Sequence, residues 1–179
     1  MKRDLSTFST DFSFTLIQKL RLAAWLLVQH LIFKSPFLPR KFRPYLLRLF
    51  GSSVGRQVII RRGVLIHFPW NLELGNNCWV GEEVYFINHE KIKIGSDVCI
   101  SQKSIICSSS HDFRTSNLKF SHKPINIKNG AWVCLNAKVL PGVTIGECSV
   151  VSAGEIAQNS VPDYSMLISG EIHPINLSS

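Results

Sequence analysis

Aliphatic residues recur at six-residue intervals from Val54 almost to the C-terminus, and no other feature of the sequence constrains the fold as much. The hexads fall into five groups, which begin at Val54, Leu74, Ile94, Ile127 and Ile145. A glycine often follows the aliphatic position, where a tight corner favours a residue without a Cβ. Such hexad repeats are typical of β-helices. We therefore expect an all-β solenoid of about five coils, each with three short strands around a continuous aliphatic core.

The spacing of the five groups predicts the shape of each coil. The first three groups begin twenty residues apart, so the two residues beyond three hexads should bulge at the same corner each time. The last two groups begin eighteen residues apart. Between Ile106 and Ile127 there are fifteen surplus residues, about 112–126, which must leave the prism. Because a long loop in a compact domain is usually functional, we expect chemistry near its start.

Composition narrows the class of protein. A chain of 179 residues with 45% hydrophobic residues suits one domain and excludes intrinsic disorder. The five cysteines are odd in number and form no C-x-x-C pair, which favours small buried thiols in a reducing cytoplasm over a disulfide or zinc framework. We expect no metal site.

Positive charge is concentrated in the N-terminal segment, residues 1–50, which holds nine Lys and Arg against two Asp. Its apolar residues at helical spacing predict an amphipathic helix that ends near Pro36, followed by a short helix over about 39–50. The longest uninterrupted apolar run is too short to span a bilayer. Two compatible roles follow, namely capping the first coil and lying on an anionic membrane surface. No nucleic-acid motif accompanies the charge, so we do not expect a nucleic-acid partner.

These patterns divide the chain into three parts. Residues 1–50 form the basic helical segment, residues 51–170 the solenoid with its loop at 112–126, and residues 171–179 a C-terminal tail.

Four stretches follow one another in an informative order. They are Phe-Pro-Trp-Asn-Leu-Glu-Leu-Gly at 68–75, Ser-His-Asp at 110–112, Lys-Pro-Ile at 123–125 and Val-Leu-Pro-Gly-Val-Thr-Ile-Gly at 139–146. In this order they resemble the hexapeptide-repeat acyltransferases, in particular the colanic-acid and exopolysaccharide O-acetyltransferases related to maltose and galactoside acetyltransferases. The resemblance covers about residues 26–170, and the last three stretches are far more specific than the hexads.

This resemblance implies a left-handed parallel β-helix and a cytoplasmic homotrimer with sites between neighbouring subunits. It also implies transfer of an acetyl group from acetyl-CoA to a sugar hydroxyl in polysaccharide biosynthesis. A lipid-linked saccharide acceptor at the inner face of the cytoplasmic membrane would suit the basic N-terminal segment.

The resemblance also assigns roles on the acceptor side. Removing the proton of a sugar hydroxyl needs a base, and a histidine that titrates near neutral pH is suited to this. The resemblance places His111 in that role. Asp112 is expected to orient the imidazole or contact the acceptor, and Asn88 to bind an acceptor hydroxyl.

On the donor side, the resemblance assigns the backbone N–H of Leu135 to the oxyanion of the tetrahedral intermediate. It places Trp132 and Ala153 along the coenzyme A groove. Asn159 stands where a phosphate-pairing lysine is common in the family, and Glu155 adds a negative charge nearby. These departures predict weaker binding of the polyanionic coenzyme and leave the base untouched.

Two other readings remain open. A non-catalytic solenoid scaffold would explain the altered groove. A zinc hydratase of the carbonic anhydrase type shares the solenoid and uses three histidines. His67, His89 and His111 are spaced by twenty-two, but they occupy different places in their hexads, so we expect them to lie apart.

Overall fold

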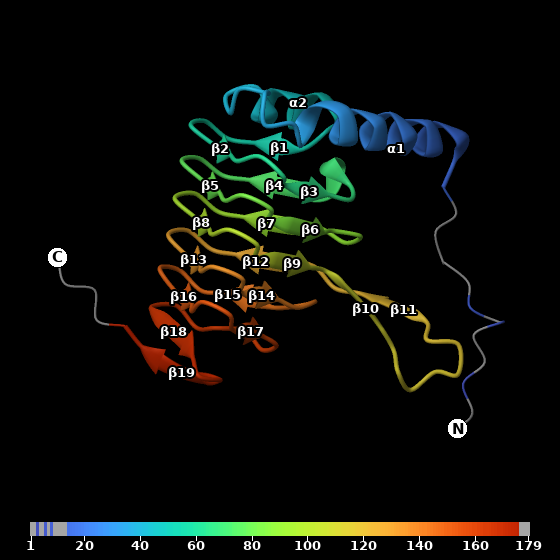
Figure 1. Cartoon of the computed structure of the whole chain (residues 1–179). Coiled ribbons are helices and arrows are strands. Elements are labelled where there is room, and N and C mark those ends of the chain that lie inside the picture. Colours follow the sequence, from blue (N-terminus) through green and yellow to red (C-terminus); the bar gives the residue numbers. More distant parts are fainter. Residues whose placement is uncertain (1–2, 4–5, 7, 9–13, 176–179) are drawn as a thin grey trace.

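Three parallel sheets form the faces of a prism in the computed structural model, which describes residues 3, 6, 8 and 14–175 (Figure 1). The first face contains β1 (Ser53–Val54), β4 (Leu72–Leu74), β7 (Ile92–Ile94), β12 (Ile125–Ile127) and β15 (Thr144–Ile145). The second contains β2 (Ile59–Ile60), β5 (Trp79–Val80), β8 (Cys99–Ile100), β13 (Trp132–Val133), β16 (Val150–Val151), β18 (Ser165–Ile168) and β19 (Glu171–Pro174). The third contains β3 (Leu65–Ile66), β6 (Tyr85–Ile87), β9 (Ile105–Cys107), β14 (Lys138–Val139) and β17 (Ile156–Ala157).

The hexad residues point into the prism, as expected, and pair with their equivalents one coil away. On the second face this produces one ladder of buried side chains, which consists of Ile60, Val80, Ile100, Val133, Val151 and Leu167. Each rung covers the apolar surface of the rung before it, so burial is continuous along the axis. The expected solenoid is therefore confirmed.

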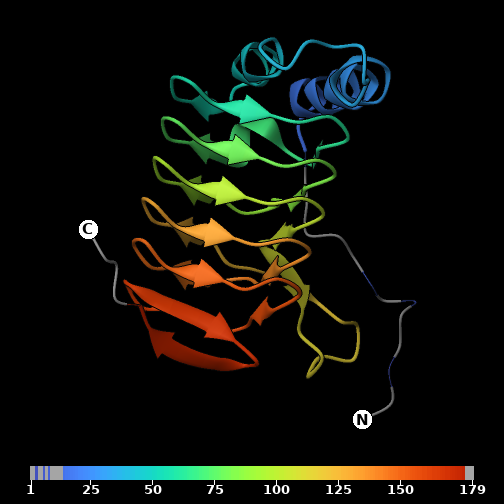
Figure 2. The same cartoon turned by 60° about the vertical axis from the view of Figure 1, so that its left-hand side comes forward.

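The C-terminal end of the solenoid adds to the expected five coils. Val161 pairs with Ile145, and β18 continues the second face, so a sixth, partial turn follows the five complete ones. The chain then reverses, and β19 pairs antiparallel with β18. Residues 171–174, expected in a tail, thus belong to the second face, while residues 176–179 lie outside the described chain. The coils stack in order from the helical end to this hairpin (Figure 2).

Helices cover the other end of the prism. Helix α1 (Leu16–Val28) continues as the π-helix η2 (Gln29–Phe33), and α2 (Arg43–Leu49) follows. The Trp25 indole Nε1 donates to the carbonyl of Ile66, and the Gln29 amide oxygen accepts from the N–H of Ile66, each at 2.7 Å. The N–H and the carbonyl of Ile66, in the open edge strand β3, are thereby both satisfied. The capping role is confirmed, although α2 begins later than expected because residues 40–42 form a turn.

Three corners join the faces, and two of them concern function. The second corner joins the second and third faces at residues 61–64, 81–84, 101–104, 134–137 and 152–155. The third corner joins the third face to the first. It holds the bulge in the early coils, where it includes the short helix η3 (Pro69–Asn71). In the third coil the same corner opens into the antiparallel hairpin β10 (Ser109–His111) and β11 (Phe120–His122), which projects from the prism (Figure 1).

Candidate active site at the third corner

His111 is the last residue of β10 and lies opposite Phe120 of β11. Its side chain is exposed, and its ring centroid lies 4.4 Å from that of Phe120. The imidazole Nδ1 is 2.7 Å from the carbonyl oxygen of Leu118. A carbonyl only accepts hydrogen bonds, so Nδ1 carries a proton, and in the neutral tautomer that this contact selects Nε2 holds the lone pair. The hairpin therefore fixes the tautomer in which Nε2 is the basic nitrogen.

Asp112 pairs with Arg114 rather than with the imidazole. Its carboxylate accepts from the Arg114 Nε at 2.8 Å, Nη2 at 3.0 Å and backbone N–H at 3.0 Å. These hydrogen bonds hold the pKa of Asp112 below its ordinary value. The expected orienting role therefore falls to the Leu118 carbonyl. Asp112 still lies beside the base, because a cavity of about 270 Å³ is lined by Ser110, His111, Asp112, Phe113, Arg114 and Ser121.

Asn88 does not offer its amide to a ligand. The side chain is 0% exposed. Its Oδ1 accepts from the N–H of Phe68 at 3.0 Å and its Nδ2 donates to the carbonyl of Phe68. The prediction that Asn88 binds an acceptor hydroxyl is therefore wrong for this conformation, since a fully buried amide has no surface for a sugar. Its role is to hold the bulge of the first coil against that of the second.

The other histidines come closer together than the hexads predict. The rings of His67 and His89 lie 5.2 Å apart, and His89 stacks on His122 at 5.5 Å. The expectation fails because the bulges at the third corner displace these residues from the hexad register. Sequence reasoning missed His122, which antiparallel pairing in the hairpin brings opposite Ser109. Within the described chain, no group of three or more His, Cys, Asp or Glu side chains is arranged to hold a metal ion.

His89 fixes the inner side of the hairpin. Its Nδ1 is 2.6 Å from the hydroxyl oxygen of Ser109, two residues before His111. Burial, with smaller effects from His67 and His122, lowers the pKa of His89 to about 4. The side chain is thus neutral at pH 7 and belongs to the support of the hairpin.

The residues expected along the coenzyme groove lie at or beside the second corner. Trp132 and Leu135 are half exposed, and Ala153 is exposed. The Trp132 Nε1 donates to the Ser101 hydroxyl at 2.8 Å, which fixes the indole against the prism. Among the residues that the structure describes, no acceptor pairs with the Leu135 N–H, so this donor is available to a ligand.

The last coil explains one departure from the family pattern. The Glu155 carboxylate accepts from the N–H groups of Ser169 and Gly170, and so it caps the turn between β18 and β19. Asn159 lies at a separate cavity of about 290 Å³, lined also by Ile156, Gln158, Leu167, Gly170 and Ile172.

One chain does not bring the predicted base and the predicted oxyanion donor together. Leu135 precedes β14, whereas His111 follows β9, its neighbour in the third face. The two groups therefore lie beyond opposite ends of neighbouring parallel strands, Leu135 at the second corner and His111 at the third. A site that uses both takes them from two copies of the chain.

The chain is similar to acetyltransferases in sequence. It is 39% identical over 161 residues to the putative colanic acid biosynthesis acetyltransferase WcaF of Escherichia coli K12, a match that covers 89% of this chain and 88% of the relative. It is 31% identical over 112 residues to a putative acetyltransferase of Schizosaccharomyces pombe, covering 60% of this chain and 54% of that protein. No family model matches the chain.

Solved structures share the fold. A maltose O-acetyltransferase from Clostridium difficile 630 superposes with a TM-score of 0.80 at 19% identity, covering 91% of this chain and 90% of its own. A hexapeptide-repeat acetyltransferase of Vibrio cholerae in complex with acetyl-CoA gives 0.80 at 21% identity, covering 92% and 91%. A galactoside acetyltransferase in complex with coenzyme A gives 0.79 at 19% identity, covering 92% and 84%. The fold is thus the left-handed parallel β-helix.

Proposed function

Because the chain belongs to the family of the colanic acid biosynthesis acetyltransferases, we propose that it transfers an acetyl group from acetyl-CoA to a hydroxyl of a saccharide used in exopolysaccharide synthesis. One observation supports this reaction most directly. The Leu118 carbonyl holds the Nδ1 proton of His111, which leaves Nε2 as a base at the mouth of a cavity.

The reaction then follows from the two groups. His111 Nε2 removes the proton of the acceptor hydroxyl as its oxygen attacks the thioester carbonyl, a contribution of about 10²–10⁴-fold. The Leu135 N–H of a neighbouring subunit donates to the oxyanion that forms. When the C–S bond breaks, the His111 imidazolium returns its proton to the departing thiolate. Acetyl-CoA supplies the activated acyl group, and no redox step is needed.

We propose a homotrimer with three such sites, each between adjacent subunits. His111 lies at the third corner and Leu135 at the second corner of one chain. This placement supports the arrangement, because side-by-side prisms would bring the third corner of one subunit to the second corner of the next. The groove residues Trp132 and Ala153 would then face the hairpin of the next subunit.

The test is His111→Ala, assayed by acetyl-CoA consumption with a panel of sugars and saccharides. We expect activity to fall by about 10²–10⁴-fold, while light scattering shows an unchanged oligomer. His173→Ala is the matched control, since His173 lies on β19, far along the chain from the hairpin. Full activity of His111→Ala would refute the proposed base.

We also propose that the outer face of α1 rests on the inner surface of the cytoplasmic membrane. Leu16, Leu20 and Leu27 of α1 and Leu31 of η2 are exposed on this face, although their spacing helped to predict the helix, and Ile17 is exposed as well. Together α1 and η2, Leu16–Phe33, form a helix that by length and composition is long and apolar enough to cross a bilayer, contrary to what its longest uninterrupted apolar run predicted. Trp25 and Gln29 nevertheless tie its inner face to the first coil. An apolar outer face among basic residues favours a helix that lies in the interface.

Vesicle flotation tests this contact. Replacing Leu20, Leu27 and Leu31 together by Ser should abolish retention on anionic vesicles without lowering the unfolding midpoint, because these side chains are mostly exposed to solvent. Unchanged retention, or a smaller oligomer in the variant, would show that the face does not bind membrane.

A further inference from the structure

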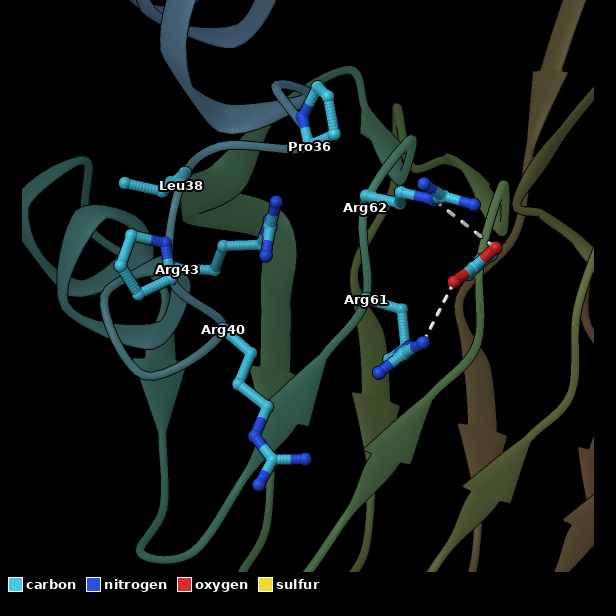
Figure 3. Close-up of a pocket in the computed structure, with 8 residues that line it drawn as sticks. Pro36, Leu38, Arg40, Arg43, Arg61 and Arg62 are labelled. Atoms are coloured by element: carbon cyan, nitrogen blue, oxygen red, sulfur yellow. Dashed lines mark hydrogen bonds and ion pairs between the residues drawn. The ribbon is translucent and has the colours of Figure 1, made fainter.

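A cavity of about 390 Å³ lies where the N-terminal cap meets the second corner. Arginine dominates its lining. Arg40 and Arg43 come from the cap, whereas Arg61 and Arg62 come from the first coil, as Figure 3 shows. Glu82 is the acidic residue of this lining, and it pairs with Arg61 at 2.9 Å and with Arg62 at 3.4 Å. Four cations around one carboxylate leave an excess of positive charge.

Arg43 shows that this excess is not compensated by the protein. The side chain is only 2% exposed, yet its hydrogen bonds go to carbonyl oxygens, from Nε to Phe33 at 2.9 Å and from Nη2 to Ser35 at 2.6 Å. Burial and the nearby charge of Arg61 lower the pKa of Arg43. A buried cation without an anionic partner is costly, and an anion in the cavity would offset that cost.

Arg40, from the same side of the cavity, leads to the same conclusion. It lines the cavity, and its side chain makes no hydrogen bond or ion pair within the described chain. Guanidinium groups suit oxyanions that accept two parallel hydrogen bonds, and phosphate is the common case. We propose that this arginine cavity is a binding site for a phosphate or diphosphate group.

The place of the cavity in the solenoid suggests which phosphate it binds. Backbone hydrogen bonds link the second corner from coil to coil. The N–H groups of Glu83, Lys103, Asn136 and Gly154 donate to the carbonyls of Arg62, Glu82, Gln102 and Leu135, respectively. The arginines thus continue the line of the coenzyme groove toward the cap. This assignment rests on the proposed function. The site would hold the phosphate of a phosphorylated acceptor, and the hydroxyl of that acceptor would reach the coil that contains Leu135.

The surface around the cavity fits a lipid-linked form of that acceptor. Phe37, 90% exposed, and Phe42 lie on the same loop as Arg40. Apolar side chains beside a phosphate site match a headgroup at a membrane surface.

Calorimetric titration of the full chain with inorganic diphosphate, without acetyl-CoA, tests the site independently of catalysis. We expect Arg40→Ala and Arg62→Ala each to raise the dissociation constant at least about tenfold, as for the loss of a charged hydrogen bond. Lys41→Ala is the matched control, because Lys41 is the next residue on the same exposed turn and does not line the cavity. Equal weakening by all three variants, or no binding by the wild type, would overturn the proposal.

Two further arms identify the source of the phosphate. Neutral vesicles that carry a polyprenyl diphosphate should retain the wild type and lose Arg40→Ala if the ligand is lipid-linked. A nucleoside-diphosphate sugar that displaces inorganic diphosphate, without vesicle retention, would assign a soluble ligand to the same site. Failure of acetyl transfer with intact diphosphate binding would refute the proposed function and leave the site standing.

Discussion

At the scale of single residues, Asn88 and His111 show how far side-chain type alone determines a role. Both are polar residues of the third corner, yet one is sealed beneath the bulge and the other stands on a projecting hairpin. The difference comes from backbone hydrogen bonds. The Phe68 backbone occupies the Asn88 amide on both sides, whereas the Leu118 carbonyl occupies only one nitrogen of His111.

Asn88→Ala is expected to lower the free energy of unfolding by about 1–3 kcal/mol, because it removes the two buried hydrogen bonds that the Asn88 amide makes with the N–H and the carbonyl of Phe68. Urea unfolding measures this. The control is Asn129→Ala on the corner between the first and second faces, because the exposed Asn129 amide also accepts from a backbone N–H, that of Ser96, but at a site where water can replace it. A substrate ligand would behave differently. An unchanged midpoint with a raised KM for the acceptor would restore Asn88 to the binding site.

His89 predicts a pH dependence of stability. Its pKa is about 4 in the folded chain, below the ordinary 6.5, so between these values the unfolded chain binds a proton that the folded chain does not. The free energy of unfolding should therefore fall as the pH falls through this interval. His89→Gln, which removes the titration and retains a partner for Ser109, should lose less stability between pH 7 and pH 5 than the wild type. Equal losses would contradict the assignment, and exposed His30→Gln is the control.

At the scale of elements, the helix formed by α1 and η2 has two apolar faces with separate tasks. Trp25 and Phe33 are buried, with ring centroids 5.2 Å apart, and they close the first coil. The leucines of the opposite face are mostly exposed to solvent. A helix of this kind stabilises the solenoid through one face and remains available to a surface through the other.

Trp25→Ala should cost about 3–5 kcal/mol, the usual range for truncating a buried aromatic side chain, and it also removes the hydrogen bond to Ile66. Because coils contact only their neighbours, the loss should appear first as faster amide exchange in residues 53–66. Leu27→Ala on the outer face should leave that exchange unchanged. Uniform faster exchange through all coils would show that the cap is not a local element.

The same elements show what the sequence can and cannot predict. Strand positions followed from the hexads, since a side chain such as Ile106 must either enter the core or leave the repeat. The contacts of His89 did not follow, because a bulged corner has no fixed register and its geometry depends on packing between coils. The exposure of the outer face of α1 could not be predicted from the sequence either. Periodicity finds an apolar stripe on a helix, but Trp25 and Gln29, not the leucines, provide the interactions that choose the docked face.

At the scale of the whole molecule, the proposed active site is a property of the assembly. Mixing inactive His111→Ala with a groove-blocked Ala153→Trp variant tests this directly. Sites that combine an intact hairpin with an intact groove arise only in mixed trimers, so co-refolded protein should regain part of the wild-type activity while each variant alone does not. If refolded mixtures stay inactive although mass spectrometry shows mixed trimers, both groups belong to one subunit.

The reversed strand at the C-terminal end has a consequence for growth of the stack. A parallel ladder grows by templated addition, as fibrils do, whenever its terminal strand presents a matching edge. Here β19 runs against the ladder, and Pro174, opposite Ser165, lacks the N–H that an incoming strand would use. The charged Glu171 and the polar His173 occupy the same edge and further discourage pairing. The hairpin therefore prevents strands of other molecules from adding to this end of the sheet, so the solenoid does not extend into a fibril.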